Sequence, residues 1–128
     1  SPAERAGVGD LPETSQPSSL VEAMVALDLE LERLKEARKH GWSGIPNQPD
    51  IIPAHTATLA WELLRELGRT RDTAARPEAY RHELTASAKA AGQLRDLLRD
   101  ENSDLPTRDA ALLALQQSCV RCHKTFRN

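Results

Sequence analysis

Apolar residues recur with a helical period along most of the chain, beginning just after Ser19. The first series is Leu20, Met24, Leu27, Leu31 and Leu34. Steps of three and four residues place such side chains on one face of an α-helix. Three later segments show the same period, and none alternates apolar and polar residues as a half-buried strand does. The sequence therefore predicts an all-α protein.

Turn-forming residues divide this pattern into four helices. Their expected ranges are about 19–40, 53–71, 77–101 and 107–127. Ser19 with Glu22 has the spacing of a capping box, and Pro53 and Pro77 suit first-turn positions. Thr107 is the expected cap of the last helix. Similar lengths and short connections favour an antiparallel up-down-up-down four-helix bundle.

The first 18 residues lack this period. They combine five prolines and glycines, Pro2, Gly7, Gly9, Pro12 and Pro17, with small polar residues. Such a composition is typical of a segment without a packed core. We therefore expect a flexible N-terminal arm over residues 1–18 and one bundle domain over 19–128.

Composition narrows the function further. The net charge is -2 and the basic residues are not gathered into a stripe, which excludes a nucleic-acid-binding class. No apolar run reaches the roughly 18 residues of a membrane helix. Aromatic residues make up only 3% of the chain, so a buried porphyrin is one way to fill the core. An Ala- and Leu-rich helical core explains the same composition without a cofactor.

Small residues crowd the middle of the third helix, over 86–92. Ala, Ser and Gly side chains there would let a neighbouring helix or a flat ligand approach the backbone closely. High helix propensity of alanine is an equally good explanation.

The decisive motif is Cys-Val-Arg-Cys-His at 119–123, which contains the only two cysteines. The C-x-x-C-H arrangement is the one that attaches c-type haem. Cys119 and Cys122 project from neighbouring parts of one helical turn, where they can bond two vinyl-derived carbons of a porphyrin edge. His123 can then reach the iron from one face. The motif therefore predicts one covalently attached haem c.

Other uses of this cysteine pair remain open. A redox disulfide usually lies at a helix N-terminus in a strand-helix unit, whereas this pair ends a helix. A structural zinc site needs two more ligands, and His40, His55 and His82 are poorly placed to supply them. The third alternative is a structural Cys119–Cys122 disulfide.

The C-terminal run C-V-R-C-H-K-T-F-R, at 119–127, resembles the end of the cytochrome c-prime family. Ala75-Arg76-Pro77-Glu78-Ala79-Tyr80 is similar to the way that family often opens its third helix. The resemblance implies that Cys119 and Cys122 are thioether donors, that His123 is the proximal iron ligand and that Arg127 lies near the haem. It also implies a periplasmic location, with the arm as a possible tether, and a homodimer in many members.

The sixth iron position depends on Met24, the only methionine. In the expected bundle, the start of the first helix lies beside the end of the last, so Met24 and His123 are at about the same height. Met24 also belongs to the inward apolar face. It is therefore the expected distal ligand, although most such methionines only fill core space. Met-ligated bundle relatives place a methionine in the same way.

Contacts to the haem propionates are less well defined. Arg81 lies near the apolar face of the third helix and is a candidate together with Arg127, although both also suit a solvated surface. Family members often carry an arginine early in the first helix, and none occurs from Leu20 to Leu31.

These residues lead to three functional hypotheses. The first is a mono-haem electron carrier with His123 and Met24 as axial ligands, redox proteins as partners and no catalytic residues. The second is a five-coordinate haem protein that binds nitric oxide or carbon monoxide. The third is a haem-free helical module that binds a partner protein and contains a disulfide.

Overall fold

The computed structural model describes residues 2–126, with side chains described for 20–125. The secondary structure of this part consists of five helices without a β-strand. The helices are α1 Pro2–Lys39, α2 Pro53–Gly68, α3 Arg71–Ala74, α4 Glu78–Arg99 and α5 Leu105–Phe126. The expected all-α class is confirmed.

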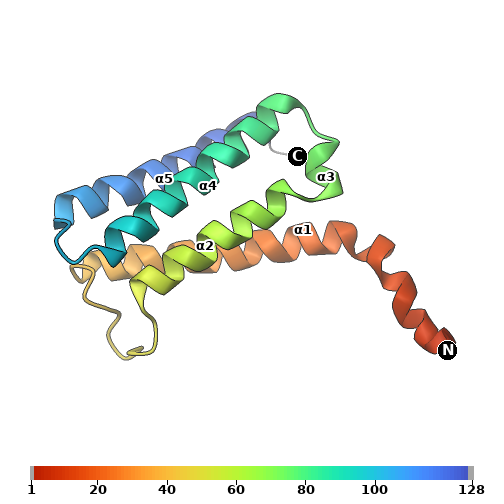
Figure 1. The fold of residues 1–128 in the computed structure, drawn as a ribbon, viewed down its shortest axis with the longest axis horizontal. Helices are drawn as coiled ribbons and strands as arrows, with labels where there is room; N and C mark the ends of the chain where they lie inside the picture. The colour runs from red at the N-terminus through yellow and green to blue at the C-terminus, as the bar shows by residue number, and fades with distance from the viewer. Residues whose placement is uncertain (1, 127–128) are drawn as a thin grey trace.

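The four long helices do not contact one another equally. Helix α2 packs most extensively against α4 and also against α1, while α4 packs against α5. Figure 1 shows α4 and α5 running side by side on one side of α2, with α1 on the other. Helices α1 and α5 have few contacts with each other. This leaves room between α1 and α5 for a cavity.

The structure differs from the sequence prediction at the end of α2 and in the segment that follows it. Helix α2 begins at Pro53 as expected but ends at Gly68, three residues before the predicted end. The following short helix α3 was not predicted, because four residues are too few to show an apolar period. Its cap is Thr70, whose hydroxyl accepts a hydrogen bond from the backbone N–H of Thr73 at 3.1 Å.

The start of α5 shows why the expected cap was wrong. Asp104 Oδ1 accepts a hydrogen bond from the backbone N–H of Thr107 at 2.9 Å. Asp104 therefore satisfies a free N–H group of the first turn, and the helix begins at Leu105. Thr107 lies inside this first turn rather than before it.

The N-terminal end of α1 also differs from expectation. The helix begins at Pro2, whereas the sequence predicted a start at Ser19. Side chains before Leu20 are not among those described, and this includes Ser19 of the expected capping box with Glu22. The flexible arm over residues 1–18 stays a prediction.

The loop after α1 is fixed at the end of the bundle far from the C-terminus. Gly41 has a φ of 69°, in the left-handed region, and the N–H of Trp42 donates to the Ala37 carbonyl at 2.8 Å. The Trp42 ring is buried, and its Nε1 donates to Asp109 Oδ1 at 2.8 Å. This bond ties the loop to α5.

The core follows the predicted apolar faces with one addition. All five members of the first series are buried or half-buried. The same holds on α4 for the positions with a helical period, Tyr80, Leu84, Ala88, Ala91, Leu94 and Leu98. On α2 the apolar spacing predicts Leu59, Leu63 and Leu67 as the inward series; Leu67 is buried as predicted and Leu59 and Leu63 are half-buried, but Leu64 is buried as well. Among the small residues of α4, Gly92 lies against α2, where an added Cβ would meet the Trp61 ring at 3.2 Å.

Candidate cofactor-binding site

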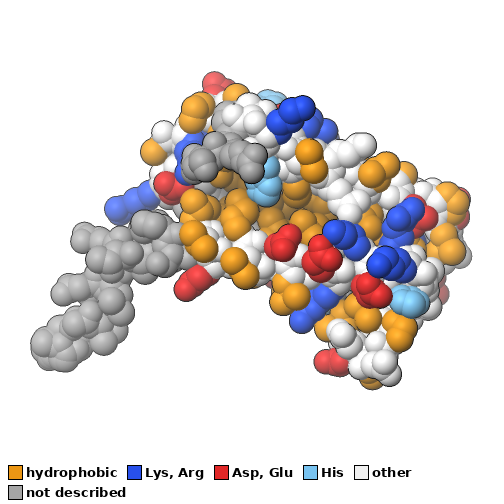
Figure 2. All heavy atoms as spheres, turned by 180° about the vertical axis from the view of Figure 1, so that it is seen from behind, with side chains coloured by type: hydrophobic (Ala, Val, Ile, Leu, Met, Phe, Trp, Pro, Cys, Tyr) orange, Lys and Arg blue, Asp and Glu red, His pale blue; other side chains and the backbone are white. Residues whose placement is uncertain are grey.

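A cavity of about 460 Å³ opens between α1 and α5. Ligand sites in proteins commonly have volumes of about 300–1,000 Å³. Figure 2 shows this face of the molecule, where the surface is hollowed and hydrophobic side chains form the floor. The lining residues are Leu20, Val21, Met24, Val25, Leu27, Asp28, Leu31, Leu64, Leu84, Ser87, Cys119, Cys122 and His123. All three reactive residues of the C-x-x-C-H motif therefore face one largely apolar cavity.

The α5 wall follows directly from helical spacing. Residues three and four apart lie on the same face of a helix, so Cys119, Cys122 and His123 are neighbours on the last turns of α5. Cys122 is only 8% exposed, Cys119 is half-buried and His123 is exposed. The two sulfurs are thus in the protein interior, while the imidazole lies at the mouth of the cavity.

The α1 wall carries Met24. Its side chain is half-buried and lines the cavity, as His123 does from α5. The sequence placed these two residues at the same height of the bundle, and the structure brings them to the same cavity. Iron ligation by Met24 stays a prediction.

Both cysteines are free thiols in the structure. Burial raises the pKa of Cys122, and the nearby charge of Glu83 raises it further, whereas Arg76 acts in the opposite direction. Glu83 in turn pairs with Arg121 of the motif, with 3.6 Å between Oε1 and Nε. A raised thiol pKa keeps Cys122 protonated at neutral pH. Redox-active C-x-x-C pairs instead have a lowered thiol pKa.

Cys119 has different neighbours. Burial raises the pKa of its thiol, and side-chain hydrogen bonds with Ser118 and Ser87 partly offset this rise. The two serine hydroxyls are 2.8 Å apart and link α4 to α5. The two thiols of the motif are therefore in chemically distinct environments.

The two arginines predicted to contact propionates are not both described. Arg81 is exposed and does not line the cavity, and Arg127 lies outside the described residues. Among the described lining residues, the one carboxylate is Asp28 of α1, which would repel a carboxylate of a ligand.

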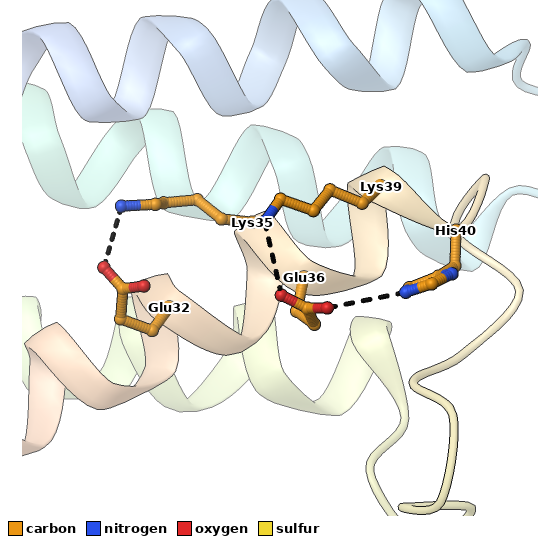
Figure 3. Close-up of polar contacts among 5 residues, drawn as sticks. All are labelled: Glu32, Lys35, Glu36, Lys39 and His40. Carbon is orange, nitrogen blue, oxygen red and sulfur yellow. Dashed lines mark hydrogen bonds and ion pairs between the residues drawn. The ribbon is translucent and has the colours of Figure 1, made fainter.

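The other histidines lie elsewhere. His40 is exposed at the end of α1, and its Nε2 is 3.4 Å from Glu36 Oε2. Figure 3 shows this pair together with the neighbouring ion pair between Glu36 and Lys39. His55 and His82 are exposed, and neither lines the cavity.

In the part of the chain whose side chains are described, no group of three or more His, Cys, Asp or Glu side chains is close enough to hold a metal ion. In the same part, no helix is both long and apolar enough to cross a membrane.

The sequence did not single out every residue of the cavity wall, and Ser87 and Leu64 are two examples. Ser87 was grouped with the small residues of the third helix, and no apolar period could single out a polar side chain that faces inward. Leu64 was missed because it is not a member of the series Leu59, Leu63 and Leu67. Both line the cavity, Leu64 from α2 and Ser87 from α4.

Compared with models of known protein families, with curated proteins and with solved structures, the chain matches none.

Proposed function

We propose that the chain is a mono-haem c-type cytochrome of the cytochrome c-prime kind, which transfers single electrons to and from redox proteins. Cys119 and Cys122 would hold the haem covalently, and His123 and Met24 would be the axial ligands. The finding that supports this most strongly is the cavity itself, because the three motif residues and the only methionine line it from opposite helices.

The residues present fit such a group. A haem is flat and largely apolar, and apart from the three motif residues and Met24 the cavity is bounded by leucine and valine side chains, with Asp28 and Ser87 as the polar exceptions. Burial raises the pKa of both thiols, which is unlike the lowered thiol pKa of a redox-active C-x-x-C pair. The few contacts between α1 and α5 leave this side of the bundle open for a flat molecule.

The role of each residue follows from its place. When bound, the haem supplies an iron that changes between two oxidation states without chemistry on a substrate. His123, at the mouth of the cavity, approaches from the α5 side and Met24 from the α1 side. Leu31, Leu64 and Leu84 would exclude water from the interior edge, which favours a higher reduction potential.

Five-coordinate gas binding is the alternative within the same site. It would apply if Met24 only fills space, leaving one face of the iron accessible to nitric oxide or carbon monoxide. A haem-free module with a Cys119–Cys122 disulfide is the second alternative. The cavity beside both sulfurs favours the haem protein over it.

The finer features of the protein belong to the same proposal. They are the antiparallel up-down-up-down order of the long helices, a periplasmic location and a homodimer. The homodimer is supported by three exposed apolar residues of α1: Val21, Val25 and Leu29 are 60%, 65% and 50% exposed, and Val21 and Val25 also line the cavity. A stripe of this kind is a common feature of interfaces between copies of a chain.

Covalent attachment can be tested by the mass of the purified chain. The chain is exported in a bacterium that attaches haem to a known cytochrome c in parallel. We expect the wild type to gain the mass of one haem and Cys119→Ser/Cys122→Ser to gain none. Val120→Ala is the matched control, because Val120 is 63% exposed and does not line the cavity. A wild-type chain without haem in this host would refute the proposal.

A further inference from the structure

Arginines that are far apart in the sequence meet on one face of α2 and α4. They are Arg65 and Arg69, at the end of α2, and Arg95 and Arg99, at the end of α4. Helices α2 and α4 pack against each other more extensively than any other pair, and Figure 1 shows them side by side. The chain as a whole has a net charge of -2, so a cluster of arginines makes this face different from the rest.

Trp61 of α2 holds two of these arginines. The Cζ atoms of Arg65 and Arg95 lie 4.6 Å and 4.4 Å from the centre of its ring. Both distances are within the range of a cation–π interaction. The ring can reach α4 because Gly92 has no side chain there. The two guanidinium groups are thus fixed in place across the two helices.

The other two arginines extend this contact along the helices. Arg99 Nη2 donates to Thr58 Oγ1 of α2 at 3.2 Å. Thr58, Trp61, Arg65 and Arg69 are three or four residues apart, which places them on one face of the helical turn. From first to last they span roughly 17 Å at 1.5 Å per residue. The four arginines therefore form a row, called the arginine row below.

Carboxylates offset only part of this positive charge. Glu66 Oε2 is 3.1 Å from Arg69 Nη1, and Asp96 Oδ1 is 2.9 Å from Arg95 Nε. Both carboxylates are exposed, and such surface pairs are weak. Glu62 is exposed on α2 but pairs with none of the four. The other two arginines of the row have no carboxylate partner among the described residues.

A groove of about 250 Å³ lies beside the arginine row, between α2 and α4. Arg65 and Arg69 line it, and no carboxylate does so among the described residues. Its volume is below the about 300–1,000 Å³ of common small-molecule sites, so it suits side chains of a partner protein better than a whole ligand. Leu64 and Leu84 line both this groove and the larger cavity, so they form a wall that the two share.

We propose that the arginine row and the α2–α4 groove are the docking surface for a redox protein with an acidic surface. Carboxylates of the partner would pair with Arg65 and Arg99, and one of its apolar side chains would enter the groove. One electron would leave the reduced partner, which is oxidised, and cross the wall of Leu64 and Leu84 to reduce ferric iron to ferrous iron. The redox role of the partner rests on the proposed function, whereas its acidic charge does not.

The structure of the row suits such an interface. Tryptophan and arginine are the residues that most often dominate binding energy in protein interfaces. Because Trp61 and Thr58 already hold three of the four arginines, fewer side chains have to be ordered when a partner binds. Complementary charge mainly raises the association rate, which suits a transient redox complex.

The test measures electron transfer to the haem-bearing chain, with a reduced, acidic plant-type ferredoxin as the probe. The second-order rate is followed by stopped flow at low salt. Arg65→Glu/Arg69→Glu should lower this rate roughly tenfold, because steering by opposite charge changes to repulsion. Arg65→Lys/Arg69→Lys keeps the charge and should stay within about twofold of the wild type. The wild-type rate should fall as salt is added, and the Glu variant should respond less.

Lys35→Glu/Lys39→Glu is the matched control. It also reverses two exposed charges, each paired with a glutamate three residues before it, as Arg69 is with Glu66. Both lysines are on α1, away from the row, and the rate should stay within about twofold of the wild type. An equal fall in the two Glu variants would show a general effect of charge and overturn the proposal. An unchanged rate in Arg65→Glu/Arg69→Glu would overturn it as well.

Binding measured without electron transfer separates this proposal from the proposed function. Oxidised ferredoxin is titrated calorimetrically into the same three double variants and the wild type, where the order of affinities should follow that of the rates. A wild type that carries no haem refutes the proposed function, while this titration still decides whether the row binds an acidic protein. If the wild type binds vesicles of phosphatidylglycerol through the row but does not bind ferredoxin, the partner is a membrane surface and the proposal is overturned.

Discussion

Leu84 offers a quantitative test of whether the cofactor fills the cavity. Its side chain is only 4% exposed and lines the cavity, whereas Leu94, ten residues along the same helix, is fully buried and does not line it. Truncating a buried leucine to alanine costs about 2–5 kcal/mol, more where the void cannot relax. In the haem-free chain, Leu84→Ala enlarges an existing cavity and should cost about 2–3 kcal/mol, near the lower limit.

The cost should change when the cavity is filled. In the haem-bearing chain, Leu84→Ala removes contacts with the bound group and leaves a new void, which adds about 1–2 kcal/mol. Leu94→Ala should cost about the same in both forms, because its neighbours do not change.

Urea unfolding of both variants, each with and without haem, measures these free energies of unfolding. The decisive quantity is the difference between the two forms for Leu84→Ala, compared with that for Leu94→Ala. Equal costs for Leu84→Ala in both forms would refute the placement of the cofactor in this cavity. An equal rise for Leu94→Ala would also refute it, since the effect would then be general.

Three further predictions concern other parts of the account. The folded haem-free chain should lose stability as pH rises above the ordinary thiol pKa of 9.0, because burial raises the pKa of both cysteines and the unfolded chain ionises first. Urea midpoints at pH 8 to 11 should show this fall, and Cys119→Ser/Cys122→Ser should reduce it. Trp42→Phe should cost about 1 kcal/mol in urea unfolding because it removes the 2.8 Å bond to Asp109; an unchanged midpoint would contradict that role. Leu29→Arg, outside the cavity but on the exposed stripe of α1, should convert a homodimer to a monomer in sedimentation experiments, and a wild type that is already monomeric would contradict the dimer.

Much of the fold follows from side-chain periodicity. The spacing of Leu20, Leu27 and Leu34 predicts a helix face that is buried or half-buried in the structure. Helix ends were less predictable where two neighbouring side chains could each cap the same helix. Asp104 rather than Thr107 caps α5 because its carboxylate reaches the free N–H group, and the sequence contains both candidates.

The cavity could be anticipated only in part. The motif itself places Cys119, Cys122 and His123 on one helical face, so their meeting is a local consequence of the sequence. Ser87 is 31 residues from its partner Ser118, and its inward position depends on how α4 packs against α5. Arg81 is exposed and does not line the cavity, so its contact with a propionate stays a prediction.

The central claim is that the chain carries a haem with His123 and Met24 as axial ligands. The most direct test is the optical spectrum of the purified protein, oxidised and reduced, beside Met24→Leu, which keeps the apolar volume but removes the sulfur. Val21→Ala is the control, because it lines the same cavity without a ligating atom. The account predicts a low-spin haem with a far-red sulfur-to-iron band that Met24→Leu abolishes and Val21→Ala retains. A high-spin spectrum that Met24→Leu leaves unchanged would contradict it.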